Sequence, residues 1–425
     1  MDIDNQNVAL KASENEPPYV YSQALAKQLN LNKEIEFKEN DFNILLNNKR
    51  YRKDLLLRLI THEMIHGLGF IEFHKIDYVS DGENMERIGL KNTVFNEKSD
   101  LNDAKILPRP IINYDLEQIN QSKTCGDVHK GNVIGFTPLS IFEKYIVDIN
   151  SKTKVLEGLE NLYQEFSNCL KDGNLSTDKK KCYESLSPNS KKLMSEIPTK
   201  YYMKKDSIGF LTNDNTVVPL QTFEAEYGSG SSVCHSRTDY EAFKEEYDKY
   251  ESNMRKELQA DFNEKYQSLN CDTSVSEACT KLKEMLPSLD EEIDSYVKTE
   301  EAKNSYWEKN ISKYFDENFL MNFVTVTEFT SDYLLSTVGK NNRHGLIGNG
   351  IVDIFKTMGW TEKGQLKSDK IYYVADDINF PKPASLNQIF KLKELGCPIS
   401  GVANISSIKV STSLLVTLGL ILLLL

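Results

Sequence analysis

The hydrophobic positions of this chain follow a helical spacing most regularly between residues 240 and 269. Steps of three and four residues place them on one face, which predicts a single long amphipathic helix. The members of this apolar stripe are Tyr240, Phe243, Tyr247, Tyr250, Met254, Leu258, Phe262, Tyr266 and Leu269. After a break at residues 269–276, a second helical stretch runs to about Tyr314. The two stretches predict a charged helical hairpin inserted into a larger domain, with the stripe used for packing rather than for ligand binding.

A second helix is predicted from residue 53 to residue 68. The apolar run 55–60 leads into it, and Gly67 and Gly69 mark its end, where a left-handed turn is needed.

The rest of the chain has weaker patterns. Residues 1–40 are polar with short helical stretches, residues 75–135 are rich in loops, and residues 139–172 alternate apolar and charged positions at helical spacing. Residues 42–47 and 208–218 predict short strands. The expected fold is therefore α+β and mostly helical overall.

Composition and charge exclude several classes of protein. Hydrophobic residues make up 40% of the 425 residues and aromatic residues 10%, as in a globular protein with a large core. The net charge of -12 argues against a nucleic-acid partner and against a basic patch that binds anionic membranes. The seven cysteines contain no C-x-x-C pair, so a zinc ribbon or finger is not expected. Two pairings are predicted, Cys271 with Cys279 at the hairpin tip and Cys169 with Cys182.

Candidate chemistry lies in the predicted helix 53–68, where residues 61–70 read T-H-E-M-I-H-G-L-G-F. His62 and His66 are four residues apart and project from one face, so both imidazoles can reach one metal ion. Glu63 lies beside the first histidine, where it can take a proton from water. This is the H-E-x-x-H arrangement of zinc-dependent peptide hydrolysis. The pattern also occurs by chance on amphipathic helices, but the apolar run and the two glycines favour a metal site.

A catalytic zinc ion usually has three protein ligands, so two histidines require a partner. The compact metzincin signature places a third histidine at position 72, where this chain has Glu72. Three candidates remain: Glu72 itself, His74 and the distant His235. Cys234, beside His235, is a further possible ligand as a thiolate, although an oxidising compartment favours a disulfide there.

Further segments follow the helix motif in a particular order. They are an S-x-x-H at residues 232–235, an F-L-M at residues 319–321 and a helix ending in M-G-W at residues 358–360. In this order they resemble leishmanolysin-like metzincins, and most of all the GPI-anchored zinc endopeptidases of fungi. The resemblance implies a zincin-type catalytic domain with His235 as the third zinc ligand and Met321 in a turn beneath the metal. It also implies peptide hydrolysis with Glu63 as the general base.

The resemblance, the insertion and the terminal pattern together divide the chain into five parts. They are a metzincin-like part at 1–235, the hairpin insertion at 236–315, the Met-turn and last catalytic helix at 316–365, an extension at 366–400 and a terminal signal at 401–425.

The terminal pattern predicts a place at the cell surface. Residues 414–425 are almost entirely apolar, follow a polar spacer, and are too short to cross a bilayer. With the small residues near position 401 they form a GPI signal, with attachment expected at Gly401 or else at Asn404. The sequons at Asn120, Asn174 and Asn310 are then expected to be glycosylated. Because the first residues contain no signal peptide, the true start is expected upstream of Met1.

The expected function is a GPI-anchored, cell-surface zinc endopeptidase that acts on peptides or proteins. The alternative is a non-catalytic surface or wall protein on a zincin scaffold. A third hypothesis is an intracellular helical interaction protein with a chance H-E-x-x-H.

Overall fold

The computed structural model describes residues 2–5, 7–45, 52–78, 104–113, 132–171, 184–228, 233–365, 369–378 and 380. The chain forms two compact units. The first comprises residues 1–237, 320–323 and 349–425, and the second comprises residues 238–319 and 324–348. About 43% of the residues are helical and 16% are in strands, which confirms the expected α+β class.

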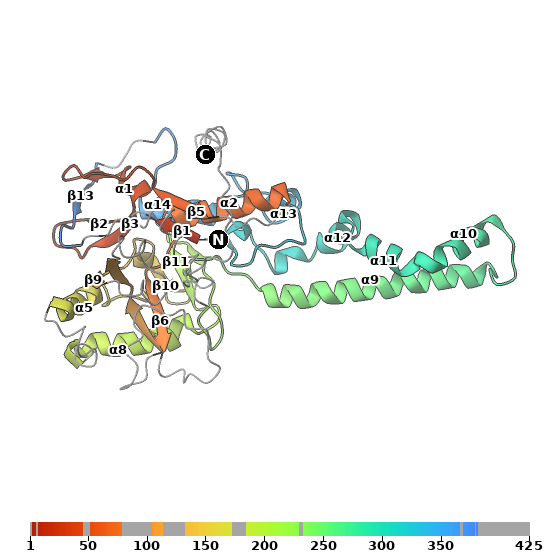
Figure 1. Ribbon diagram of the computed structural model, residues 1–425, viewed down its shortest axis with the longest axis horizontal. Coiled ribbons are helices and arrows are strands. Elements are labelled where there is room, and N and C mark those ends of the chain that lie inside the picture. Colours follow the sequence, from red (N-terminus) through yellow and green to blue (C-terminus); the bar gives the residue numbers. More distant parts are fainter. Residues whose placement is uncertain are drawn as a thin grey trace, which may run out of the picture. The chain divides into compact units, whose positions relative to one another are not determined.

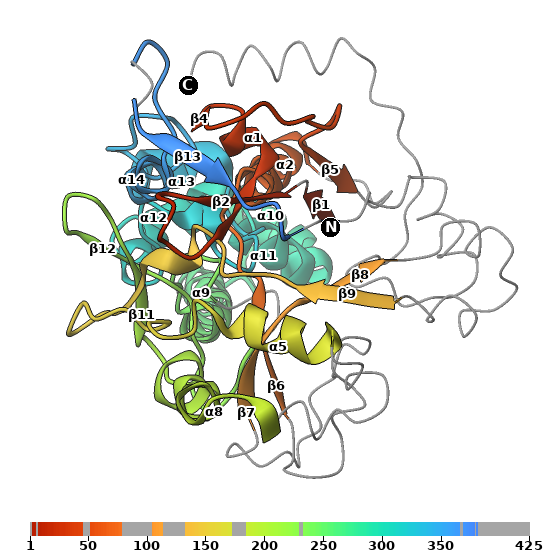
Figure 2. The same cartoon turned by 90° about the vertical axis from the view of Figure 1, so that its left-hand side faces the viewer.

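The first unit is built on several small sheets of short strands. One sheet has the order β3 (Tyr19–Ser22), β2 (Asn7–Lys11), β13 (Ile371–Val374) and β4 (Asn30–Leu31). Strand β13 runs antiparallel to β2 and parallel to β4, so it joins the two ends of the chain in one sheet (Figure 2). The remaining strands are β1 (Asp2–Asn5) with β5 (Phe42–Leu45), β6 (His74–Tyr78) with β7 (Ala104–Pro108), β8 (Pro110–Asn113) with β9 (Asn132–Phe136), and β10 (Ile146–Asp148) with β11 (Ile208–Leu211) and β12 (Val217–Pro219).

These strands correct two expectations. The segment 1–40 forms strands and one short helix, α1 (Gln23–Ala26). The described parts of 75–135 lie in two antiparallel strand pairs, and the rest of that segment, where loops are expected, lies outside the described residues. The segment 139–172 is helical only in the 3-10 turn η3 (Glu143–Tyr145) and in α5 (Leu162–Lys171). Between them lies β10, whose apolar residues pair with β11 instead of lining a helix. The strands expected in 42–47 and 208–218 are present as β5, β11 and β12.

Helix α2 (Lys53–Gly67) carries the H-E-x-x-H motif, as predicted. Its buried face follows helical spacing through Leu55, Arg58, His62, Ile65 and His66. The helix ends at two glycines with different roles. Gly69 adopts the left-handed φ of +122°. A Cβ on Gly67 would lie 2.6 Å from the ring of Phe42, so β5 can pack closely against the helix only because this residue has no side chain.

Two further helices belong to the first unit, and the short π-helix η4 (Pro198–Tyr202) follows the first of them directly. Helix α8 (Pro188–Ile197) has Ser187 as its N-cap, and α14 (Asn349–Met358) precedes the M-G-W segment. Along the described part of the chain, no helix has the length and apolarity that a membrane crossing requires.

The second unit contains the predicted helical hairpin, which we call the arm (residues 240–307). Helix α9 (Tyr240–Ser268) forms one side, and α10 (Glu277–Met285), α11 (Leu289–Val297) and α12 (Glu300–Trp307) return along it (Figure 1). The return is three helices because Pro287 lies in the 3-10 turn between α10 and α11, and Thr299 caps α12. The short helix α13 (Ser331–Thr337) also belongs to this unit.

The aromatic stripe of α9 packs inside the arm, as predicted. Trp307 is fully buried, and its ring centroid lies 5.3 Å from that of Phe243 and 5.9 Å from that of Tyr247. Ring pairs at these separations contribute about 0.5–1.5 kcal/mol each beyond their buried area. Phe243, Tyr247, Tyr250 and Phe262 of the stripe are therefore core, whereas Leu269 at its end is 40% exposed.

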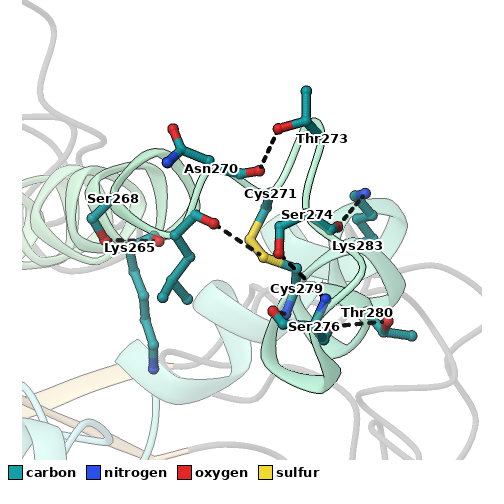
Figure 3. Close-up of a disulfide and its surroundings, with 11 residues drawn as sticks. Lys265, Ser268, Asn270, Cys271, Thr273, Ser274, Ser276, Cys279, Thr280 and Lys283 are labelled. Carbon is teal, nitrogen blue, oxygen red and sulfur yellow. Dashed lines mark hydrogen bonds between the residues drawn. A yellow bond between two sulfur atoms is a disulfide. The ribbon is translucent and has the colours of Figure 1, made fainter.

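A disulfide between Cys271 and Cys279 closes the arm tip, as predicted (Figure 3). The two Cα atoms are 5.0 Å apart, and the hydroxyl of Ser276 caps α10 by accepting the Cys279 N–H at 3.3 Å. Cys169 is also disulfide-bonded, but its expected partner Cys182 lies outside the described residues.

The modification sites are described only in part. Asn120, Asn174, Gly401 and Asn404 lie outside the described residues, as does the terminal segment 401–425. Asn310 is partly exposed at the start of a 3-10 turn, and its Nδ2 donates to the Tyr306 carbonyl at 3.1 Å. Its glycosylation stays a prediction.

Candidate metal centre

Three histidines from two distant segments meet in the first unit. The Nε2 atom of His66 lies 3.1 Å from Nε2 of His62 and 3.3 Å from Nε2 of His235. All three potential ligand atoms lie within 4.8 Å of one another. The residues are buried, with 8%, 9% and 5% of their surface exposed for His62, His66 and His235. They form a buried triad that could hold a metal ion.

The opposite ring nitrogens of the two helical histidines face carbonyl oxygens. Nδ1 of His62 lies 2.6 Å from the Leu320 oxygen, and Nδ1 of His66 lies 2.7 Å from the Phe70 oxygen. A carbonyl only accepts, so each Nδ1 carries the proton and donates it. In a neutral imidazole the other nitrogen, Nε2, is then a bare lone pair. The close Nε2 contact between His62 and His66 is therefore not a hydrogen bond between neutral rings.

Burial disfavours protonation of the three histidines. It lowers the pKa of His66 to about 3, with a further contribution from His62, and lowers the pKa of His235 well below its ordinary value. It also lowers the pKa of His62, although the hydrogen bond to Leu320 acts in the opposite direction. At neutral pH the converging Nε2 lone pairs are therefore open to a metal ion. Three neutral imidazoles match the protein ligands of some catalytic zinc sites.

Main-chain pairing fixes the segment that carries His235. Ser236 bridges Leu220 on one side and Asn322 on the other. The His235 carbonyl accepts the Gln221 N–H at 2.9 Å, and the Ser236 N–H donates to the Met321 carbonyl at 2.9 Å. The third histidine is therefore held between the segments that contain Leu220 and Asn322.

The segment 320–322 connects both parts of the triad. The carbonyl of Leu320 accepts from His62, and the next carbonyl, that of Met321, accepts from the residue after His235. Met321 is fully buried and ends the 3-10 turn η7 (Phe319–Met321). Nothing in the sequence marks Leu320 or Phe70 as partners of the histidines, because each acts through a main-chain carbonyl that every residue has.

Glu63 follows His62 on α2 and is partly exposed, whereas the triad is buried. A carboxylate at the margin of a buried cluster can exchange protons with solvent.

The two alternative third ligands are engaged elsewhere. The Glu72 carboxyl group accepts a hydrogen bond from the Tyr227 hydroxyl. The His74 main-chain N–H donates to Glu143 Oε1 at 2.9 Å, and its Nδ1 lies 3.3 Å from the same oxygen. Among the described residues, neither joins a cluster of three potential metal ligands.

Glu143 is the centre of a buried hydrogen-bonded corner. Its Oε2 accepts the Ser140 N–H at 2.6 Å, and the Ser140 hydroxyl accepts the Glu143 N–H at 3.0 Å, which is a capping box. Burial raises the pKa of Glu143, but the interactions with His74 and Ser140 outweigh it and hold that pKa below its ordinary value. Glu143 and His74 therefore form a structural pair.

Cys234 is a free, buried thiol, so the disulfide expected there is wrong. Its Sγ lies 3.7 Å from Nδ1 of His235, the ring nitrogen opposite the one that meets His66. Burial, reinforced by Glu72, raises the pKa of the thiol well above its ordinary value. The sulfur is therefore neutral and behind the triad.

The substitution Glu72→Gln tests whether Glu72 is a metal ligand. Burial raises the pKa of Glu72 well above its ordinary value, which favours the neutral carboxyl group, and an amide is a close match to that form. We expect zinc content to be unchanged and the free energy of unfolding to stay within about 1 kcal/mol of wild type. Tyr227→Phe, which leaves the buried carboxyl without its donor, is expected to cost about 1–3 kcal/mol. Metal analysis and urea unfolding measure both effects; loss of zinc in Glu72→Gln would make Glu72 a ligand.

The architecture and the triad together define an α+β protein with a buried three-histidine site that could hold a metal ion. The chain belongs to the SPBPB7E8-like family, which matches residues 8–313. That range contains His62, His66 and His235 and the whole arm. No curated protein and no solved structure matches the chain.

Proposed function

We propose that this protein is a zinc-dependent endopeptidase. The observation that carries the proposal is the convergence of three buried Nε2 atoms, two of them from rings whose Nδ1 protons are held by carbonyls. Such preorganised imidazoles cost little to order around a metal ion. The H-E-x-x-H spacing on α2 and the resemblance to leishmanolysin-like metzincins support zinc as the ion and peptide hydrolysis as the reaction.

His62, His66 and His235 would hold the ion. Zinc bound by three neutral imidazoles keeps its full charge, and it supplies a Lewis acid that polarises a peptide carbonyl and makes water more acidic.

Glu63 is the residue that moves protons. It follows a ligand histidine directly on α2 and is partly exposed, so its carboxylate can receive a proton from the attacking water. The same carboxyl then gives that proton to the leaving amine, which completes hydrolysis without a covalent enzyme intermediate. The buried histidines take no part in proton transfer, because both ring nitrogens of His62 and His66 are committed.

We further propose that the enzyme acts outside the cell on peptides or proteins, with a GPI anchor that holds it to the membrane. The terminal signal and the sequons of the sequence support this location. The free thiol of Cys234 is compatible with it, because a buried sulfur is shielded from oxidants.

Metal removal tests the proposal on the full chain purified from a secretory host. We expect one zinc ion per chain, and hydrolysis of an unfolded protein substrate that stops on treatment with a chelator and returns with added zinc. Zinc binding without hydrolysis of any peptide in a broad library would favour the non-catalytic surface protein. The absence of bound zinc would contradict the site itself.

A further inference from the structure

Each histidine of the triad has a hydrogen-bond partner behind its ring. For His62 and His66 the partners are the carbonyls of Leu320 and Phe70, at 2.6 Å and 2.7 Å. For His235 the partner is the sulfur of Cys234, at 3.7 Å from Nδ1. Sulfur is larger than oxygen and a weaker acceptor, so its contacts are longer. The three rings therefore share one arrangement, with Nε2 inward and Nδ1 facing a hydrogen-bond partner.

The main chain fixes the position of Cys234. The residue before it, Val233, donates its N–H to the Gln221 carbonyl at 2.9 Å, and the residue after it, His235, accepts from the Gln221 N–H at 2.9 Å. Gln221 therefore forms hydrogen bonds to the main chain on both sides of Cys234, which restricts the position of the thiol. Only 7% of Cys234 is exposed.

A side-chain hydrogen bond also holds the part of the chain that precedes Cys234. Tyr227 donates its hydroxyl hydrogen to Glu72, which follows the end of α2. Tyr227 is itself buried and packs edge-on against Tyr202 at a centroid distance of 6.1 Å. The chain that leads to His235 is therefore tied to the chain that leaves the H-E-x-x-H helix.

We propose that Cys234 is a positioning residue of the metal centre, whose sulfur accepts the Nδ1–H of His235 and holds Nε2 of that ring toward His66. The inference rests on the proposed metal site and goes beyond it by giving a role to a residue outside the ligand set. Because a sulfur acceptor is weaker than a carbonyl, His235 is the least firmly oriented of the three ligands. Loss of an outer hydrogen-bond partner of a metal ligand reduces metal affinity about 10–100-fold.

The test compares Cys234→Ser, Cys234→Val and Cys234→Ala in the full chain. Serine keeps an acceptor, valine keeps the apolar volume without an acceptor, and alanine keeps neither. Zinc affinity is measured by competition with a chromophoric chelator. We expect valine and alanine to weaken zinc binding about 10–100-fold and serine to weaken it less. Zinc affinity equal to wild type in Cys234→Val would overturn the proposal, because packing alone would then explain the contact.

Two further measurements keep the result interpretable. Thermal unfolding of each metal-free variant identifies those that fail to fold, and zinc affinity is compared only among the variants that fold. Cys234→Val and Cys234→Ser both test whether an acceptor is needed at this position. The absorption spectrum with cobalt(II) in place of zinc reports on the ligand atoms. A thiolate-to-cobalt charge-transfer band in wild type that is lost in all three variants would make Cys234 a ligand and overturn its positioning role.

The outcomes also separate this inference from the proposed function. Wild-type protein that binds no zinc or cobalt would overturn both. Wild-type protein that binds zinc, with variants that bind it equally well, would overturn the role of Cys234 alone.

Discussion

Replacing His235 with alanine is expected to abolish tight zinc binding. The change removes one of three converging Nε2 atoms and leaves two histidines on one helix, a set with one ligand fewer than catalytic zinc sites use. The loss of affinity should exceed the roughly 10–100-fold that follows from losing an outer partner. Competition with a chromophoric chelator measures it. His344→Ala is the matched control, because His344 lies in the second unit and outside the triad.

Thermal unfolding gives a second measure of the same change. A ligand that binds only the folded state stabilises it by an amount that grows with the ratio of its concentration to Kd. Added zinc should therefore raise the melting temperature of wild type and of His344→Ala, but not that of His235→Ala. Without metal, the missing ring leaves a cavity in a buried site, so the melting temperature of each variant is compared with and without zinc. An equal zinc-induced shift in His235→Ala would show that His235 is not a ligand.

Glu63→Gln is expected to lower kcat/KM for peptide hydrolysis by about 10²–10⁴-fold, because an amide cannot accept the proton of the attacking water. Zinc content should not change, since Glu63 is not one of the three converging residues. The measurements are hydrolysis of a fluorogenic peptide and metal analysis on the same preparation. Glu72→Gln is the control for the same change of a carboxyl group to an amide near α2 but outside the triad. A Glu63→Gln protein with wild-type turnover would refute the proton-transfer role.

The parts of the fold that the sequence predicts well are those with local repeating patterns. The stripe on α9 repeats from Tyr240 to Leu269, and the buried face of α2 repeats from Leu55 to His66. The Cys271–Cys279 disulfide spans a separation of only eight residues. In each case the interacting positions lie on one element or within one turn, so spacing alone identifies them.

Strands such as β2 and β10 were missed because a partner of each is remote in sequence. Strand β2 pairs with β13 through Lys11 and Tyr373, and most strands have only two to five residues. A run that short shows too few alternations to be distinguished from a loop or a helical turn. Ile146 and Val147 illustrate this, because they fit helical spacing but pair with Phe210 and Gly209.

The candidate site shows the same division. His62, Glu63 and His66 follow from spacing, but the residues alone left Glu72, His74 and His235 as possible third ligands. The third ligand is decided by the pairing of Ser236 with Leu220 and Asn322. Asn322 lies more than eighty residues after Ser236 in the sequence, so local spacing cannot show this contact. The free state of Cys234 was also beyond prediction, because it depends on burial behind His235.

The disulfide at the arm tip has a consequence for a protein cut by proteases. It encloses Val275, which is 93% exposed and lies in the short connection between α9 and α10. A single cut between Cys271 and Cys279 would yield a two-chain molecule that stays covalently joined. The heavy fragment would carry all three histidines, and the light fragment would carry Leu320 and Met321, whose carbonyls support them. Among the disulfides with both cysteines described, this one would then join the two polypeptides that together form the metal centre.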